Sequence, residues 1–344
     1  MRGVKSTAMT IRVLSLTTKR GVGIYQQQVE TLEEAGVEVD TIVPPGSHTT
    51  AGRESRSPAD YLRFFPLVLR ESLDDYDLIH ANFGLTAPMA LAQVRLPVVL
   101  SLWGSDLHGE FGWLSRLCAR WCDEVVVMSE AMASELDQDC HVIPHGIDFE
   151  KFQPEPPSEA RARLGWDDDA RHVLFPYAPD RTVKNYPRAE RVVERARERL
   201  GAPVKPQTVS GVEHSEIPTY MNAADVLLLT SDNEGSPNTV KEAMACNLPV
   251  VSTRVGDVPE RLDGVSLSSV GDDDAELADA LVDVLADPWR SNGREAVADL
   301  RLERTGARIR EVYGTVARQG GSVAGESATN EATDRVSTRR KDHL

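Results

Sequence analysis

The chain has 344 residues, of which 41% are hydrophobic, so it is long enough for two α/β domains that each bury a core. Its formal net charge of −16 argues against general binding to DNA or RNA. Only seven of the 38 basic residues are lysine, and this acidic, lysine-poor surface predicts solubility at very high salt, where self-repulsion is screened. An ordinary acidic protein of the cytoplasm is the alternative.

Short apolar runs alternate with helical patterns in the first half, which indicates a parallel sheet covered by helices. Strands are expected over residues 11–16, 37–43, 77–81, 97–102, 124–128 and 141–143. Helices are expected after Gly21-Val22-Gly23, ending near residue 35, and over 61–73. No apolar run reaches the length of a bilayer, and the first ten residues hold no secretory signal, so the expected location is the cytoplasm.

A second α/β series follows the junction Pro144-His145-Gly146-Ile147-Asp148, with strands expected over 172–175, 207–210, 224–230 and 249–253. A long final helix is expected from Arg294 to about Ala317. The sequence thus predicts five parts: an N-terminal Rossmann-like domain (1–147), a linker (148–157), a C-terminal Rossmann-like domain (158–293), a helix crossing back to the first domain (294–318) and a disordered tail (319–344). Unpaired spacing predicts buried free thiols for the four cysteines: Cys118, Cys122, Cys140 and Cys246.

The most informative segment, residues 231–246, directly follows an apolar strand. Its sequence predicts a helix that starts at the carboxyl edge of a parallel strand, with Ser236 as the N-cap and Pro237 at the first helical position. Glu242 lies almost two turns into this helix, where its carboxylate can accept hydrogen bonds from a ribose diol, and Glu234 precedes the helix. Anion binding is expected at the free N–H groups around the helix start, over Gly235, Ser236, Pro237, Asn238 and Thr239.

With a strand before it and a helix after it, the pair Glu234 and Glu242 resembles the E-x7-E motif of retaining glycosyltransferases of family 4. These proteins have the GT-B fold, in which two Rossmann-like, doubly wound α/β domains face each other across a cleft. Residues 249–253 and 256–260 resemble the family's next strand and glycine turn, and the resemblance covers about residues 10–318. An ordinary capped Rossmann helix with surface glutamates is the alternative.

The resemblance implies an arginine and a lysine against the donor pyrophosphate. Lys184 matches the family lysine, whereas Arg181 stands three residues before it, closer than the usual spacing. Two cations here would offset charge on the departing nucleotide diphosphate, a task otherwise performed by a metal, so no metal and no cofactor are expected. The run 272–274 is expected to cap a late helix. A pair of solvated loop cations is the alternative.

The first domain matches the family mainly in architecture. Gly23 belongs to a glycine turn that resembles the family's loop facing the donor phosphates, although an ordinary tight turn is the alternative. Trp103 stands where many members have histidine, and Asp106 is expected to contact the sugar or acceptor, with His108 as its alternate. A capping aspartate beside a loop histidine is the other reading. His145 replaces the asparagine of the family's interdomain segment and is expected to serve the hinge.

The predicted function is transfer of a sugar from a nucleotide diphosphate donor to a glycan, lipid-linked or small-molecule acceptor, with retention at the anomeric carbon. The residues expected to act in catalysis are Asp106, Glu234 and Lys184. The resemblance implies attack on the front face assisted by the leaving phosphate, so no covalent nucleophile is expected. A sugar phosphorylase of similar fold, a nucleotide-sugar epimerase, which the motif fits poorly, and a non-catalytic nucleotide-sugar-binding protein are the alternatives.

Two stretches of the first domain, residues 61–70 and 111–121, combine aromatic side chains with arginine and contain no acidic residue. On helices, such stretches can rest on a bilayer surface, so peripheral contact with a membrane is one expectation. The alternative is that both are ordinary Rossmann helices, with apolar faces against the sheet and solvated arginines.

Overall fold

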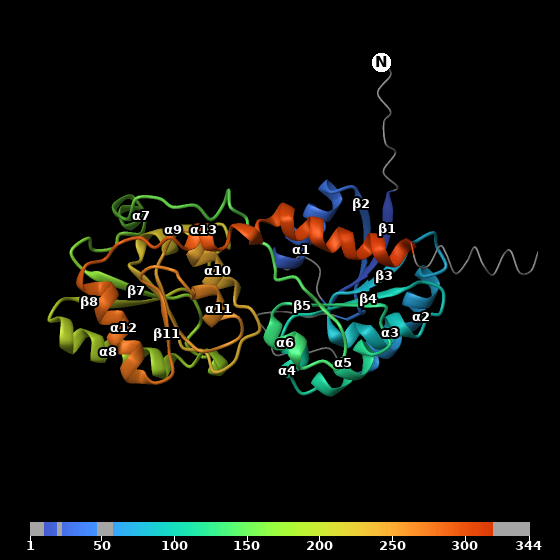
Figure 1. The fold of residues 1–344 in the computed structure, drawn as a ribbon, viewed down its shortest axis with the longest axis horizontal. Helices are drawn as coiled ribbons and strands as arrows, with labels where there is room; N and C mark the ends of the chain where they lie inside the picture. The colour runs from blue at the N-terminus through green and yellow to red at the C-terminus, as the bar shows by residue number, and fades with distance from the viewer. Residues whose placement is uncertain (1–9, 19–22, 47–57, 319–344) are drawn as a thin grey trace, which may run out of the picture.

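The computed structural model describes residues 10–18, 23–46 and 58–318, which form two α/β domains joined end to end (Figure 1). The first domain contains a parallel sheet in the order β2-β1-β3-β4-β5-β6. Because helices cover both faces, the central strands are near-continuous runs of Val, Ile and Leu, which is why the sequence predicted them. The strands are β1 (Ile11–Leu16), β2 (Val37–Ile42), β3 (Leu78–Ala81), β4 (Val98–Leu102), β5 (Glu124–Val127) and β6 (His141–Val142).

The helices of the first domain follow these strands as a doubly wound fold requires. The two longest are α1 (Gly23–Glu34) and α2 (Pro58–Glu71), both close to their expected ranges. The first two residues of the expected glycine turn and the loop 47–57 lie outside the described residues. The shorter elements are η1 (Gly84–Thr86), α3 (Ala87–Leu91), α4 (Ser105–His108), α5 (Gly112–Ala119) and α6 (Glu130–Ser134).

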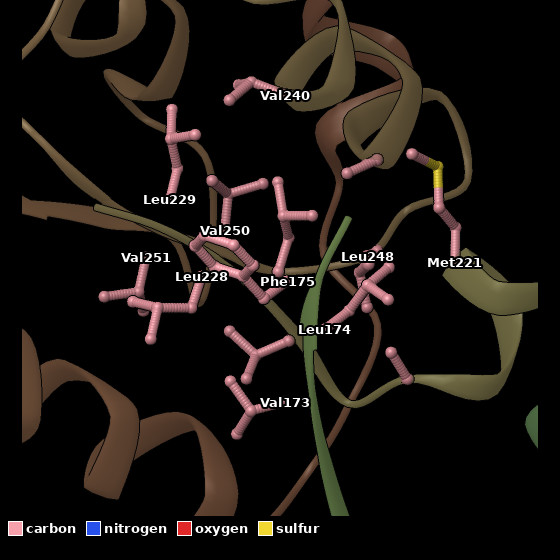
Figure 2. Packing of buried hydrophobic residues seen from close by; sticks show 14 of the residues in the cluster. Val173, Leu174, Phe175, Met221, Leu228, Leu229, Val240, Leu248, Val250 and Val251 are labelled. Atoms are coloured by element: carbon pink, nitrogen blue, oxygen red, sulfur yellow. The ribbon is translucent and has the colours of Figure 1, made fainter. Parts of the chain in front are cut away.

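The second domain contains a parallel sheet in the order β11-β10-β9-β7-β8, and its core is built from apolar side chains of the central strands (Figure 2). The strand expected over 207–210 is present, but its predicted bounds are wrong, because β8 spans Val204–Thr208 and pairs with β7 at the edge of the described sheet. At this exposed edge Pro206 needs no N–H partner, and no apolar run marks the strand. The other strands are β7 (Arg171–Phe175), β9 (Val226–Leu229), β10 (Val250–Thr253) and β11 (Ser269–Gly271).

The helices of the second domain lie between these strands and after them. They are α7 (Pro157–Leu164), η2 (Thr182–Lys184), α8 (Tyr186–Leu200), α9 (Ile217–Ala223), α10 (Asn238–Ala245), α11 (Val258–Leu262) and α12 (Asp274–Ala286). Asp273 caps α12 and accepts hydrogen bonds from the backbone N–H groups of Ala275 and Glu276. The capping role predicted for the run 272–274 is therefore confirmed. None of the described helices is long and apolar enough to span a bilayer.

The single helix expected over 294–317 is wrong, because the chain breaks into α13 (Gly293–Ala296), η3 (Ala298–Leu300) and a C-terminal helix over residues 302–318. At the break Ile147 donates its N–H to the carbonyl of Leu300 at 2.7 Å, and a β-bridge joins Ile147 to Arg301. These bonds to the interdomain segment hold Arg301 in an extended conformation. Residues 319–344, expected to be disordered, lie outside the described residues.

The C-terminal helix leaves the second domain and packs on the first (Figure 1). Its apolar side chains join the core of the first domain, and the hydroxyl of Tyr313 lies 2.6 Å from Nδ1 of His80. Nε2 of His80 is bonded to Ser101, and complete burial lowers the pKa of this histidine to about 3. His80 is therefore a neutral structural residue that ties the last helix to the first sheet.

The cysteines carry no disulfide, so the free thiols predicted from their spacing are confirmed. Cys118 and Cys246 are buried, whereas Cys122 and Cys140 are partly exposed, so burial is complete for half of the set. Burial raises the pKa of the Cys246 thiol to about 12, which keeps it protonated and unreactive at neutral pH.

Candidate functional site

The start of α10 lies at the carboxyl edge of the second sheet, where the sequence predicted the donor site. Its first turn differs in one respect. The helix begins at Asn238 with Pro237 in the N-cap position, so the N-cap predicted for Ser236 is wrong. The hydroxyl of Ser236 instead donates to Oδ2 of Asp257 at 2.8 Å. This bond fixes the segment before α10 to the turn that follows β10.

Lys184 and Glu234, which are fifty residues apart in the chain, form a largely buried ion pair beside this helix start. The hydroxyl of Ser231 also donates to the same carboxylate oxygen of Glu234, at 2.7 Å. Burial lowers the pKa of Lys184, and the negative charge of Glu234 opposes that shift. The ammonium is thus a desolvated positive charge, which acts more strongly on a nearby anion than a solvated lysine would.

Tyr177, which the sequence analysis missed, lies under both predicted cations. The Lys184 ammonium is 4.0 Å from the centre of its ring, and the Arg181 guanidinium is 5.6 Å from it. Burial, followed by the negative charge of Glu234, raises the pKa of the Tyr177 hydroxyl, and Glu242 adds to the shift. That hydroxyl is bonded to Thr239 on α10. Tyr177 therefore connects the loop after β7 to the donor helix.

The side chain of Glu242 is buried, and its Oε1 atom accepts a hydrogen bond from Nε2 of His214 at 2.9 Å. Nδ1 of His214 lies in turn 2.7 Å from the Lys151 ammonium. Neither His214 nor Lys151 was predicted, because each is separated from Glu242 by many residues and neither belongs to a motif. Asn238 adds a further polar atom, since its Oδ1 is buried without a hydrogen-bond partner among the described residues.

The first-domain candidates Asp106 and His108 lie on the short helix α4, which follows β4. Asp106 is buried, and its carboxylate accepts hydrogen bonds from the backbone N–H groups of Gly84 at 2.9 Å and Trp103 at 2.8 Å. Desolvation raises its pKa, and these backbone bonds oppose the shift. The geometry favours a residue that positions the loop after β4. The alternate, His108, pairs with Glu135 at 2.6 Å.

The two domains touch through glycine backbones. A Cβ atom placed on Gly104 would lie 3.3 Å from Cα of Gly235, and one placed on Gly235 would lie 3.0 Å from Sδ of Met132. Gly256 has a positive φ of 52°, and a Cβ there would lie 2.3 Å from the carbonyl oxygen of Gly235. By contrast, a Cβ on the exposed Gly23 would meet nothing within 4 Å, so its contact with donor phosphates stays a prediction.

A buried lysine also connects the domains. Lys241 on α10 is completely buried and donates to the backbone carbonyl of His145 at 3.4 Å. Burial lowers its pKa to about 8, although Asp257 opposes the shift. The ring of His145 meets that of Trp103 edge to face, with centroids 4.5 Å apart. His145 therefore lies between the domains, where burial lowers its own pKa to about 3, and its predicted role in a hinge stays a prediction.

Two family models match this chain, one in each domain. Residues 23–151 match the family described as Glycosyltransferase Family 4, and residues 185–287 match the one described as Glycosyl transferases group 1. A D-inositol 3-phosphate glycosyltransferase from Frankia alni is 30% identical over 275 residues, which cover 63% of this chain and 67% of that protein. The chain belongs to glycosyltransferase family 4.

Other glycosyltransferases match over a shorter region. The putative teichuronic acid biosynthesis glycosyltransferase TuaC from Bacillus subtilis is 31% identical over 213 residues, or 53% of this chain and 54% of that protein. The chain thus spans about half the length of the first curated relatives that it matches.

Two solved structures confirm the GT-B fold. Sucrose-phosphate synthase from Thermosynechococcus elongatus superposes with a TM-score of 0.72 at 20% identity, covering 89% of this chain and 98% of that one. Anabaena HepE in complex with UDP-glucose has a TM-score of 0.64 at 18% identity, with 89% of this chain and 100% of that chain covered. At this identity the likeness concerns the fold alone.

Proposed function

We propose that this family 4 protein transfers a sugar from a nucleotide diphosphate donor to a glycan, lipid-linked or small-molecule acceptor, with retention at the anomeric carbon. The observation that carries the proposal is the convergence of Lys184, Glu234 and Glu242 around the start of α10, at the edge of the sheet where ligands bind in doubly wound folds. The donor binds mostly to the second domain, and the acceptor binds mostly to the first.

Each residue has a defined task in this proposal. The Lys184 ammonium neutralises charge on the departing diphosphate, with Arg181 adding charge from the exposed loop. Glu234, which Lys184 and Ser231 hold in place, contacts the sugar, and Glu242 accepts hydrogen bonds from the ribose. The bond from the anomeric carbon to the phosphate oxygen breaks, and a bond to the acceptor oxygen forms on the same face. The acceptor proton passes to the leaving phosphate oxygen.

Acceptor-dependent release of nucleoside diphosphate tests this function. The protein is incubated with UDP-, GDP- and ADP-sugars and an acceptor panel, at the salt concentration that keeps it folded. We expect release only when an acceptor is present, and a product with the anomeric configuration of the donor. Release that requires inorganic phosphate would indicate a phosphorylase, and donor binding without any turnover would indicate a binding protein.

Chelation tests the proposal that protein cations replace a metal. Because the desolvated Lys184 supplies the positive field, we expect the rate of transfer to change less than about twofold after exhaustive treatment with EDTA. The measurement is the initial rate before and after dialysis against chelator. Loss of activity that manganese or magnesium restores would contradict metal-independent transfer.

For the acceptor side, we propose that α5 rests on a membrane surface. Trp113, Leu117 and Trp121 follow one another at helical spacing along α5 and past its end, and their exposed fractions are 63%, 48% and 75%. Arg116 and Arg120 flank this ridge, where they pair with acidic residues at its rim. The buried side of α5 carries small residues instead, so the aromatic side chains do not form the core there. Trp, Leu and Arg in this arrangement are typical of interfacial helices.

The other aromatic stretch, residues 61–70, has its main aromatic face buried. Phe64 and Val68 of α2 are completely buried, so this helix packs on the sheet as an ordinary Rossmann helix, although Leu62 and Phe65 are exposed. The membrane proposal therefore rests on α5 alone, whose ridge is formed by Trp113, Leu117 and Trp121.

Flotation with liposomes tests the α5 ridge. We expect wild type to float with vesicles containing an anionic lipid, and the variant W113S/L117S/W121S to stay in the soluble fraction, because it loses the apolar area that inserts. The matched control is W289S, which removes a tryptophan that is 77% exposed on the second domain. If wild type does not float, or if the triple variant floats as well as wild type does, the ridge is not a membrane surface.

A further inference from the structure

Three residues from three separate elements form a chain of hydrogen bonds that ends on Glu242. Lys151 lies in the interdomain segment, His214 lies in the loop between β8 and α9, and Glu242 lies on α10. The Lys151 ammonium is 2.7 Å from Nδ1 of His214, and Nε2 of His214 is 2.9 Å from Oε1 of Glu242. None of these contacts follows from the family motif, which includes Glu242 but neither Lys151 nor His214.

The chemistry of the groups fixes the direction of the chain. A lysine ammonium carries three donors and no acceptor, so Nδ1 of His214 must accept the hydrogen bond from Lys151. The ring proton therefore lies on Nε2, from which it is donated to the carboxylate of Glu242. Lys151 thus selects the tautomer of His214 that can hold Glu242.

The surroundings hold both Lys151 and His214 in place. Oδ1 of Asp148 accepts the backbone N–H of Lys151 at 2.9 Å, and this turn presents the lysine toward His214. The ring of His214 lies against the buried Phe152, with centroids 5.5 Å apart. Packing on one side and hydrogen bonds at both nitrogens leave the imidazole little freedom to rotate.

Oε1 of Glu242 consequently accepts a hydrogen bond from His214, whereas Oε2 has no such partner among the described residues. Within the described residues no group donates a hydrogen bond to Oε2, although the Glu242 side chain is only 8% exposed. Oε2 is not among the fully buried atoms that lack a partner, so it is open to solvent and a ligand hydroxyl can donate a hydrogen bond to it. The arrangement presents a single acceptor at a fixed position beside the start of α10.

We propose that His214, held by Lys151, is a positioning residue that fixes Glu242 so that Oε2 accepts a hydrogen bond from a ribose hydroxyl of the donor. This inference rests on the proposed function, because it requires a nucleotide at the start of α10. His214 itself need not touch the nucleotide. Its effect is to reduce the number of conformations that Glu242 loses on binding.

The experiment compares ribose with dideoxyribose in one site. UDP, GDP and ADP are titrated into the protein by calorimetry, and the tightest binder is compared with its 2′,3′-dideoxy analogue. Wild type is expected to prefer the ribose form. H214F keeps the ring against Phe152 but donates no hydrogen bond, so we expect it to lower this preference about tenfold and to leave the affinity for the dideoxy analogue within about twofold.

Two further variants show that His214 acts through Glu242. E242Q is expected to lower the ribose preference by a similar factor, and H214F/E242Q is expected to lower it no further than either single change, since the two residues act as one unit. H214Q, whose amide can donate to Glu242, is expected to keep part of the preference. The matched control is H141F, which breaks a histidine–glutamate pair of 2.8 Å and 43% histidine exposure in the first domain.

The outcomes separate the inference from the function on which it rests. If E242Q loses the ribose preference while H214F keeps it, the positioning role of His214 is wrong and the donor site stands. Additive losses in the double variant would also contradict the inference. If wild type binds no nucleoside diphosphate, or binds both sugar forms equally, the proposed donor site and the inference both fail.

Discussion

K184M is expected to lower kcat/KM for the donor by about 10²–10³-fold, the usual cost of removing one preorganised charge or donor at a centre where negative charge develops. The ammonium of Lys184 is buried, cation–π contact with Tyr177 holds it in place, and it pairs with Glu234. Methionine has a similar length and no charge, so the loop after β7 can keep its packing. Glu234 still accepts its hydrogen bond from Ser231 in this variant.

The measurement is the initial rate of nucleoside diphosphate release with the donor that wild type uses. K205M is the control, because Lys205 belongs to the same domain and forms a half-exposed ion pair with Asp167 at 2.9 Å. We expect K205M to stay within about twofold of wild type, since such surface pairs contribute little. A K184M protein that is folded and within tenfold of wild type would remove Lys184 from the catalytic machinery.

K241M is expected to raise the free energy of unfolding by about 3 kcal/mol at pH 7. Lys241 is completely buried, its single hydrogen bond to His145 is long at 3.4 Å, and burial lowers its pKa from 10.5 to about 8. At pH 7 the folded protein must therefore keep a desolvated charge that the unfolded chain exposes to water. Replacing such a buried charge with an apolar side chain of similar volume commonly stabilises a protein.

The pH dependence gives the sign of this effect. Between about pH 8 and 10.5 the unfolded chain binds more protons at Lys241 than the folded protein does, so wild type gains stability as pH rises through this window. The advantage of K241M should accordingly be constant below pH 8 and vanish near pH 10.5. Denaturant unfolding at pH 7 and pH 10 measures both values, with K205M as the exposed lysine control. A K241M protein less stable than wild type at pH 7 would show that Lys241 is net stabilising.

The sequence predicted those parts of the fold in which local pattern and tertiary environment agree. Strands buried on both faces, such as β4 and β9, are uninterrupted apolar runs that can be read directly. The bounds of β8 were predicted wrongly, because an edge position permits Pro206 and polar side chains. The break before the C-terminal helix was also not predicted. The bonds that hold Arg301 in an extended conformation come from Ile147, which lies far from it in the sequence.

The same distinction holds for the candidate site. Lys184, Glu234 and Glu242 belong to segments whose spacing and flanking elements mark them, and the structure brings the first two into contact. Ser236 was predicted to cap α10 from its residue type, but its hydroxyl is taken by Asp257, a competitor that no local rule includes. The partners His214 and Lys151 could not be predicted, because their association depends on how the interdomain segment, the loop after β8 and α10 meet in space.

The glycine contact between the domains has a mechanical consequence. Because Gly104 and Gly235 meet backbone to backbone, a side chain at either position would have to lie between the two domains. Each carbon atom added at either position would increase the distance between the two domains at this contact. A substitution at either position would therefore change how closely the two domains approach each other, without altering Lys184, Glu234 or Glu242.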